Sequence, residues 1–300
     1  MQLLRVRHLT RYRYARPVRF GEHRLMLRPC EHPDQTVVRE RMTITPRPLD
    51  LSFERDALGN WIGLARFEGA AKELCFESEV QVARRPIPPR PTEDGPSAHP
   101  HFARAFRAGA DGAVALWARG FLPGADVQPG VASLAAMSRA IHDDFHYRRR
   151  LEHGVQTPAQ TLATRAGACR DFAMLMIAAA RALGFQARFV SGYVHCPDEP
   201  GSARRPGGGH THAWASVRTP EQGWIDFDPT SGAVGPEGMI RVAVADEPSQ
   251  AIPIQGVYFG GADDFLGMDV EVDVISDATS TFIAAVREPD QLQRVGWSAA

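Results

Sequence analysis

The residues in this sequence that are best suited to covalent chemistry are a cysteine, a histidine and an aspartate. They occur in the order Cys169, His212 and Asp228 in the second half of the chain. A thiolate is a strong nucleophile, an imidazole can take up and return its proton, and a carboxylate can orient the imidazole. These residue types indicate acyl transfer through a thioester on Cys169.

Cys169 is expected at the start of a helix. Good helix formers dominate residues 172–183, and Gly184 follows them as a C-terminal cap. In the first turn of a helix, unpaired N–H groups and the positive end of the helix dipole favour a thiolate over a thiol. A cysteine considered alone is more often a small buried hydrophobe, so its position narrows the alternatives without deciding between them.

His212 is expected on a strand with two different faces. Along residues 210–217, one face carries His210, His212, Trp214 and Ser216, and the other carries Ala213, Ala215 and Val217. We expect the small face to lie against a helix, which leaves His212 on the opposite face. A strand histidine of this kind is more often structural than catalytic.

Asp228 and Asp226 share one face of the next predicted strand, residues 223–228. If Pro220 is the centre of an antiparallel hairpin, Asp228 lies directly opposite His212, with Cβ atoms about 4.5 to 5.5 Å apart. Asp228 would then accept the Nδ1–H of the imidazole. A shift of the turn centre by one residue would place Asp226 opposite His212 instead, and the spacing leaves both carboxylates open.

Three sequence blocks resemble the signature blocks of the bacterial transglutaminase-like family, which belongs to the papain-like superfamily. They are residues 167–173, 212–215 and 223–230. The resemblance implies that Cys169 is the nucleophile, that His212 is first the general base and then the acid, and that Asp228 rather than Asp226 is the orienting carboxylate. The likeness covers most of the chain, because further similar motifs occur at residues 10–17, 24–29, 56–60 and 242–258.

One residue near the nucleophile departs from the family pattern. Arg170 stands where many relatives have glutamine. We expect the backbone N–H of Cys169 to contribute to an oxyanion hole, and Tyr147 is a candidate for the second donor. The neighbouring basic run, residues 148–150, is interpreted as a solvated helix end.

The elements around these residues predict an α+β fold. The first 85 residues are expected to be an antiparallel β domain, with strands near residues 4–14, 24–29, 37–45, 61–67 and 73–83. Five prolines within residues 83–96 exclude a helix or a central strand there. We therefore divide the chain into an N-terminal β domain (1–85), a proline-rich linker (86–98) and a catalytic core with C-terminal strands (99–300).

The catalytic part is expected to be a papain-like transglutaminase core. Helices near residues 99–119 and 131–145 precede the cysteine-bearing helix, and strands follow near 185–194, 211–218, 223–228 and 268–275. In this arrangement the helix with Cys169 packs on an antiparallel sheet that bears His212 and Asp228.

Composition excludes several classes of partner. Lys plus Arg (34) nearly equals Asp plus Glu (35), so no overall charge favours nucleic acid or an anionic membrane. The N-terminus is charged where a secretory signal would be apolar, and we expect a cytoplasmic protein. The four cysteines show no C-x-x-C spacing, which favours free thiols over a zinc ribbon or a disulfide framework.

These observations predict a cysteine-dependent acyl hydrolase or transferase that acts on carboxamide or peptide bonds of a peptide or protein, without a cofactor. Bacterial relatives are regarded as cysteine proteases, so water is favoured over an amine as the acceptor. Protein crosslinking is one alternative. Others are a metal site built from His210, His212 and His195 or Cys196, and a non-catalytic peptide-binding module lined by Trp214 and Trp224. Substrate identity and oligomeric state are not predicted.

Overall fold

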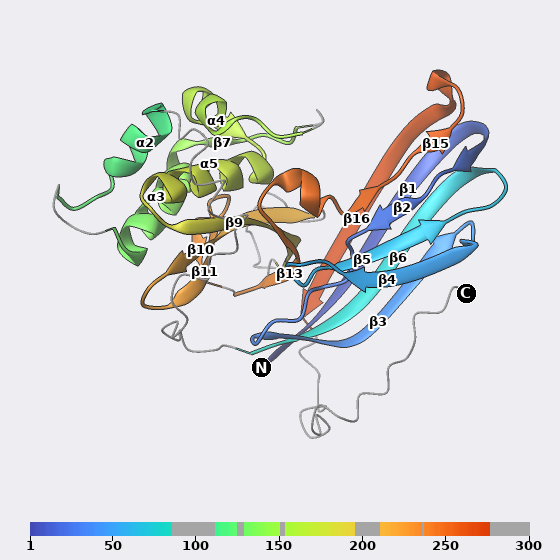
Figure 1. Cartoon of the computed structure of the whole chain (residues 1–300), viewed down its shortest axis with the longest axis horizontal. Coiled ribbons are helices and arrows are strands. Elements are labelled where there is room, and N and C mark those ends of the chain that lie inside the picture. Colours follow the sequence, from blue (N-terminus) through green and yellow to red (C-terminus); the bar gives the residue numbers. More distant parts are fainter. Residues whose placement is uncertain (86–111, 125–128, 151–153, 196–210, 236, 277–300) are drawn as a thin grey trace, which may run out of the picture.

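The computed structural model describes residues 1–85, 112–124, 129–150, 154–195, 211–235 and 237–276. Figure 1 shows two lobes, one built mainly of strands and one of helices and strands. We call the first the β lobe (β1 to β6 and β14 to β16) and the second the core lobe (α2 to α5 and β7 to β13). Cys169, His212 and Asp228 all belong to the core lobe.

The core lobe is an antiparallel sheet with helices on one face (Figure 1). The described strands run in the order β12, β11, β10, β9, β13, with bounds Ala233–Val234, Gly223–Asp228, His212–Thr219, Gln186–Val194 and Met239–Ala245. The described helices are α2 (Gly112–Arg119), α3 (Val131–Asp144), α4 (Pro158–Thr164) and α5 (Cys169–Ala182). A short parallel pair, β7 (His146–Tyr147) and β8 (Ala166–Gly167), leads into α5.

Small side chains let α5 pack closely on the middle of this sheet. Ala213, Ala215 and Val217 of β10 are buried in one hydrophobic cluster with the apolar face of α5. The helix begins at Cys169, and Gly184 takes a left-handed φ of 96° just beyond its end. Both the small strand face and the glycine cap were predicted, and both are confirmed.

The β lobe consists of two sheets packed face to face. In the described chain, one sheet runs β15, β1, β6, β3 with β16 also paired to β1, and the other runs β14, β2, β5, β4. The bounds are β1 Gln2–Phe20, β2 His23–Leu25, β3 Gln35–Thr45, β4 Asp50–Arg55, β5 Trp61–Arg66, β6 Ala71–Arg84, β14 Ile254–Gln255, β15 Tyr258–Phe259 and β16 Phe265–Ser276. Residues such as Tyr14, Leu25, Ile44 and Phe76 fill the space between the sheets.

Strand β1 belongs to the packing of both lobes. Its even-numbered side chains from Leu4 to Tyr14 point inward, as the period of two predicted. In its first half, Leu4 and Val6 pack against Tyr193 and Ile240 of the core lobe. In its second half, Tyr14 packs against the other sheet of the β lobe. The two lobes therefore share one continuous strand.

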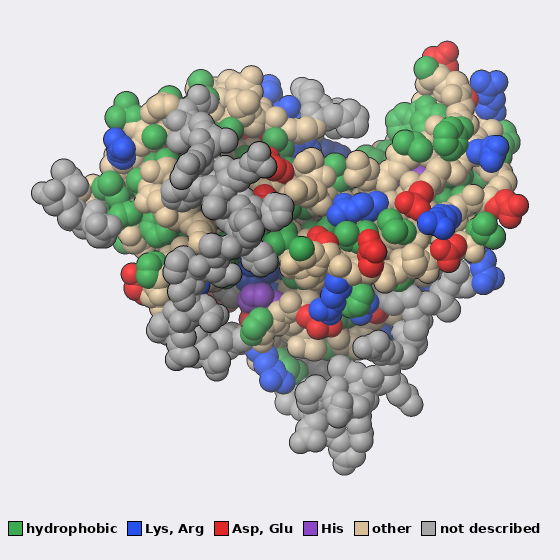
Figure 2. Space-filling model, viewed as in Figure 1, with side chains coloured by type: hydrophobic (Ala, Val, Ile, Leu, Met, Phe, Trp, Pro, Cys, Tyr) green, Lys and Arg blue, Asp and Glu red, His purple; other side chains and the backbone are tan. Residues whose placement is uncertain are grey.

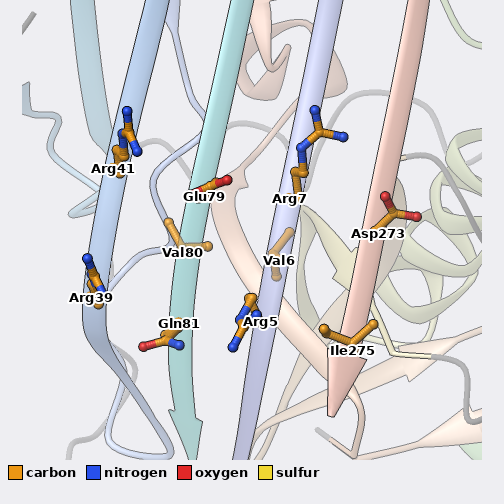
Figure 3. A pocket seen from close by; sticks show the side chains of 10 residues that line it. All are labelled: Arg5, Val6, Arg7, Arg39, Arg41, Glu79, Val80, Gln81, Asp273 and Ile275. Atoms are coloured by element: carbon orange, nitrogen blue, oxygen red, sulfur yellow. The ribbon is translucent and has the colours of Figure 1, made fainter. Parts of the chain in front are cut away.

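The outer face of the β lobe carries alternating charges. Figure 3 shows side chains of β3, β6, β1 and β16 around a shallow hollow of about 620 Å³ on this face. In register, Glu79 lies between Arg41 and Arg7, and Asp273 follows on β16. Figure 2 likewise shows basic and acidic side chains intermingled over the β lobe. This hollow lies in a different lobe from Cys169 and belongs to a solvated sheet face.

The sheets of the β lobe pair strands from both sides of the domain boundary that the sequence predicts. Strands β14, β15 and β16 were assigned to the catalytic part, but they pair with β2 and β1 of the β lobe. The division into 1–85 and 99–300 stays a prediction, and the linker at 86–98 lies outside the described residues. Strands β4 and β13 were not predicted at all. No described helix is long and apolar enough to cross a membrane.

Gly192 of β9 lies where its two neighbouring strands, β10 and β13, leave no space for a side chain. It pairs with His212 on β10 and with Arg241 on β13. A Cβ atom on Gly192 would lie 2.0 Å from the carbonyl oxygen of Ile240 and 2.7 Å from Cη2 of Trp214. Because the first of these atoms is backbone, relief would require β13 to move away from β9.

We therefore expect Gly192→Ala to lower the free energy of unfolding by about 1 to 3 kcal/mol, the usual range for overpacking. Chemical denaturation followed by circular dichroism measures this change. Gly112→Ala is the matched control, because Gly112 has no atom within 4 Å of an added Cβ and begins α2. Equal stability of the two variants would contradict the packing described here.

Candidate active site

The structure brings the three predicted residues together where α5 meets β10 and β11. Cys169 is the first residue of α5, His212 the first of β10 and Asp228 the last of β11. His212 and Asp228 are 3% and 2% exposed, whereas Cys169 is partly exposed. A partly exposed thiol next to a buried histidine and carboxylate is the arrangement that a thiol nucleophile requires.

His212 and Asp228 form a buried ion pair. Nε2 of His212 lies 3.0 Å from Oδ2 of Asp228, in a bent geometry in which the ring N–H is not aimed along the line between them. The expectation that Asp228 accepts the Nδ1–H is therefore wrong. Since Nε2 faces Asp228, Nδ1 is the nitrogen left to exchange a proton with the Cys169 thiol, a side chain that helps to raise the pKa of the ring.

The hairpin register differs from the predicted one. Ser216 lies opposite Asp226 and Thr219 opposite Gly223, which centres the turn on Glu221 rather than Pro220. Gly223 has a φ of 72°, a conformation that closes a three-residue loop and that other residues rarely adopt.

Continuing this register places Asp228 opposite Trp214, so His212 is its diagonal neighbour. The prediction of directly opposed residues is wrong. The difference of two positions along the partner strand nevertheless keeps His212 and Asp228 on one face, since side chains alternate with a period of two. The longer diagonal separation is spanned by the imidazole ring.

Asp226, the alternative carboxylate, points to a different partner. It is 1% exposed, and its Oδ2 lies 2.7 Å from Nη2 of Arg241 on β13. The two aspartates of β11 therefore form separate ion pairs, and the one next to His212 is Asp228.

The pKa of His212 is raised well above its ordinary value. Burial is the largest single influence and lowers this pKa, but the negative charge of Asp228, together with the Cys169 side chain, outweighs it. The imidazolium form is thereby favoured at neutral pH. An imidazolium can stabilise a neighbouring thiolate and later donate a proton to a leaving amine.

Asp228 is held as a carboxylate by several donors. Ser231 Oγ donates to Oδ2 at 2.6 Å, and the N–H of Thr230 donates to Oδ1 at 3.0 Å. Burial acts to raise the pKa of Asp228, but His212 and these two donors keep it below its ordinary value. The segment after β11 is therefore part of the site.

A second carboxylate, Asp171, fixes the start of α5. It is fully buried and accepts hydrogen bonds from the N–H of Ala168 (2.8 Å) and the N–H of Gln156 (2.7 Å). Nη1 of Arg150 lies 2.8 Å from its Oδ1, in a salt bridge in which the Arg150 side chain is 11% exposed. These contacts join the segments on both sides of Cys169.

Arg150 was interpreted as part of a solvated basic run, and that interpretation is wrong for this residue. Asp171 occupies the third helical position after Ala168, where an acidic side chain commonly returns to the N-cap backbone. This position in the sequence could have identified Asp171 as the residue that caps the start of α5. Arg150 lies 21 residues before Asp171, and no sequence spacing identified it as the partner.

Tyr147 lies within the electrostatic environment of Cys169. It ends β7, which pairs with β8 immediately before the cysteine. Burial, followed by the negative charge of Cys169, raises the pKa of Tyr147 to about 12. Its hydroxyl thus stays protonated at neutral pH and can donate, and its role in an oxyanion hole stays a prediction. Arg170 donates through Nη2 to the carbonyl of Arg150 at 3.4 Å.

Two alternative readings of the site depend on residues that the structure places elsewhere or does not describe. His210 and Cys196, proposed for a metal site, lie outside the described residues, and no described group of three His, Cys, Asp or Glu side chains could hold a metal ion. Trp214 is 0% exposed, so it cannot line a peptide groove as expected. The ring of Trp224 contacts the guanidinium of Arg188 at 4.0 Å.

Comparison with known families gives two matches along the chain. Residues 4–83 match the "Bacterial transglutaminase-like N-terminal region", and residues 124–229 match the "Transglutaminase-like superfamily". These matches include all three candidate residues.

Known proteins resemble nearly the whole chain or its central part. An uncharacterised Mycobacterium tuberculosis protein is 33% identical over 296 residues, covering 90% of this chain and 92% of its own. A Pseudomonas aeruginosa protein-glutamine gamma-glutamyltransferase is 33% identical over 121 residues, which cover 35% of this chain and 16% of that protein.

The structure of a cysteine protease candidate from Cytophaga hutchinsonii has a TM-score of 0.67 at 18% identity. The match covers 93% of this chain and 92% of that one. The predicted resemblance and the predicted fold class are confirmed by these findings.

We expect Asp228→Asn to lower the pKa of His212, because burial would remain while the attraction of the carboxylate is lost. The wild-type imidazole should stay protonated as pH rises past its ordinary value, and the variant should lose its proton at lower pH. Turnover should fall by about 10²- to 10⁴-fold, the usual contribution of general acid–base catalysis. An NMR titration of His212 measures the proton directly.

Ser231→Ala is the control for Asp228→Asn. It removes one hydrogen bond to Asp228 but leaves the charge, so its effect on the His212 titration should be smaller. An unchanged titration in Asp228→Asn would contradict the ion pair.

We expect Asp171→Asn to destabilise the protein by about 3 to 5 kcal/mol, because the largely buried guanidinium of Arg150 would lose its salt bridge to the Asp171 carboxylate. Combining it with Arg150→Gln should destabilise less than the sum of the two single changes. Denaturant unfolding of the four proteins completes this double-mutant cycle, and strict additivity would show that the two side chains are not coupled.

Proposed function

This chain belongs to the transglutaminase-like superfamily, and we propose on that basis that it is a thiol enzyme that hydrolyses carboxamide or peptide bonds. The observation that carries the proposal is the buried His212–Asp228 ion pair beside the helix start that bears Cys169. Within it, we assign Cys169 as nucleophile, His212 as proton carrier and Asp228 as orienting carboxylate.

Acylation follows from these positions. The Cys169 thiolate, formed by loss of its proton to His212, attacks the carbonyl carbon and forms the C–S bond. The carbonyl oxygen gains the negative charge, which N–H groups at the start of α5 can stabilise. The imidazolium then protonates the departing nitrogen, the C–N bond breaks, and ammonia or an amine leaves a thioester on Cys169.

Deacylation reverses the direction of proton movement. His212, now neutral, takes a proton from water as the hydroxyl group attacks the thioester carbonyl. The C–S bond breaks, the carboxylic acid leaves, and the proton on His212 restores the thiolate–imidazolium pair. Asp228 stays ionised throughout and stabilises the imidazolium at each stage.

An amine could replace water in the second half of the reaction. The relative from Pseudomonas aeruginosa is named a protein-glutamine gamma-glutamyltransferase, which favours transamidation as a second candidate function. The two functions share the thioester and differ only in the acceptor. The products formed from a glutamine-containing peptide distinguish them.

We expect purified protein to form a thioester with peptide substrates, and Cys169→Ala to lose both the adduct and turnover by at least about 10³-fold. Mass spectrometry of a glutamine-rich peptide mixture with a dansylated amine detects the outcome. New peptide termini or deamidated glutamine indicate hydrolysis, and incorporated amine indicates transamidation.

Cys75→Ala is the control for this experiment, because Cys75 is another partly exposed thiol but lies on β6 of the β lobe. It should keep full activity. Turnover that persists in Cys169→Ala, or that disappears in Cys75→Ala, would refute the assignment of the nucleophile.

A further inference from the structure

A group of buried charges joins the two lobes. Arg241 of β13 is 5% exposed, and its Nη1 lies 2.9 Å from Oδ1 of Asp34 in the β lobe. Its Nη2 lies 2.7 Å from Asp226 on β11. Arg84 of the β lobe is buried as well, with Nη2 3.2 Å from the other oxygen of Asp34. One guanidinium therefore bridges a carboxylate from each lobe.

The backbone of Arg241 is held by the β lobe too. Gln35 donates through Nε2 to the Arg241 carbonyl at 2.8 Å, and the Arg241 N–H donates to Oε1 of Gln35 at 2.9 Å. Three residues further along β13, Asn60 makes the same reciprocal pair with Val244, at 2.7 and 2.8 Å. Two side-chain amides thus take the place of a partner strand along β13.

Arg241 lies on the edge strand β13, and its row and its side chain connect it to both strands of the candidate site. In the sheet it pairs with Gly192, which in turn pairs with His212, so Arg241 and His212 occupy one cross-strand row. Its side chain reaches Asp226, two residues before Asp228 on the same face of β11. A displacement of Arg241 would therefore move β11 relative to His212.

The buried charges around Arg241 stabilise the structure only when all of them are present. Burial on its own lowers the pKa of Arg241, but Asp226 and Asp34 raise it above the ordinary value. Burial lowers the pKa of the neighbouring Arg188 to about 10, against the attraction of Asp226. Removing one partner would leave an uncompensated charge in the interior, so the geometry of the set is tightly determined.

We propose that Arg241, anchored by Asp34 of the β lobe, is a positioning residue that holds Asp226 and β11 so that Asp228 stays in contact with His212. On this view the β lobe is a working part of the catalytic site. The inference rests on the proposed function, because it assumes that the His212–Asp228 pair activates Cys169.

The test is the pH dependence of Cys169 alkylation by iodoacetamide, quantified by mass spectrometry of the peptide that contains it. The groups that favour the His212 imidazolium are Asp228 and Cys169. In wild type, Cys169 should be alkylated fast at neutral pH. The alkylation rate should then change at alkaline pH, where the His212 imidazolium loses its proton.

Arg241→Gln distinguishes a positioning role of Arg241 from a purely electrostatic one, since the two predict shifts of the alkaline change in opposite directions along the pH scale. Removing a positive charge near His212 would by itself favour the imidazolium and move the alkaline change to higher pH. If Arg241 positions β11, its loss weakens the contact between His212 and Asp228, and the alkaline change in the alkylation rate should move to lower pH. We expect alkylation at pH 7 to slow about tenfold, which is equivalent to a shift of one pH unit.

Arg241→Gln combined with Asp34→Asn is the second variant, used where the single change does not fold, because it keeps the net charge constant. Arg241→Lys should recover part of the wild-type rate. Tyr193→Phe is the matched control: it removes a 2.9 Å hydrogen bond to His8 across the same lobe interface, on β9, without touching the Arg241 contacts. It should lower the unfolding temperature and leave the alkylation profile unchanged.

The possible results test the positioning role of Arg241 separately from the proposed function of the protein. Slow alkylation of wild-type Cys169 at neutral pH would overturn the proposed function itself. A wild-type profile in the folded Arg241 variants, or a shift to higher pH, would overturn only the positioning role. The same slowing in Tyr193→Phe would mean that any loosening of the interface has this effect, which also excludes a specific role for Arg241.

Discussion

A buried ion pair stabilises its site only while both charges stay at contact distance, and the His212–Asp228 pair places that constraint on the core lobe. The two residues lie on neighbouring strands, so the contact requires one hairpin register and no other. Gly223 determines the register by closing the turn, and Gly192 lets Trp214 and β13 come close beside His212. Asp171 and Arg150 determine where α5 begins, and hence where Cys169 meets the ring.

The two aspartates of β11 show how environment divides one residue type between two tasks. Both point to the same side of the strand, and both are almost completely buried. Asp226 meets a guanidinium that is always charged, which makes a permanent structural ion pair. Asp228 meets an imidazole, whose charge changes with protonation. Only the second pairing can participate in proton transfer.

Local periodicity predicted much of this structure because it reports directly which side chains share a face. The alternation along β1 and β10, the helix starting at Cys169 and the cap at Gly184 all follow from neighbouring residues. The hairpin centre was misplaced by one residue, because Pro220 is a strong turn former while the positive φ needed at Gly223 decides the loop. The error did not change the face of the sheet to which each side chain points, which is why the pairing of His212 with Asp228 could still be anticipated.

Contacts between distant segments were beyond local reasoning. No spacing indicates that Arg150 binds Asp171, that Arg241 bridges Asp34 and Asp226, or that β13 exists as a strand covered by side-chain amides. The nitrogen that faces Asp228 was likewise open, because the ring can turn either edge toward a carboxylate. The Arg241–Asp34 contact depends on how the lobes pack and joins residues 207 positions apart, whereas Arg150 and Asp171, only 21 positions apart, depend on packing within the core lobe.

Strand β16 has a consequence for the order in which the protein is made. It pairs with β1 from Tyr14 back to Leu4, although the two strands lie at opposite ends of the described chain. During translation β1 emerges first, and it waits for β16 until residues 265–276 have left the ribosome. Pairing between such distant segments is slow to form. A nascent chain that ends just after Asp228 already carries all three candidate residues but still lacks β14, β15 and β16 of the β lobe, and its β1 keeps an open edge until β16 has emerged.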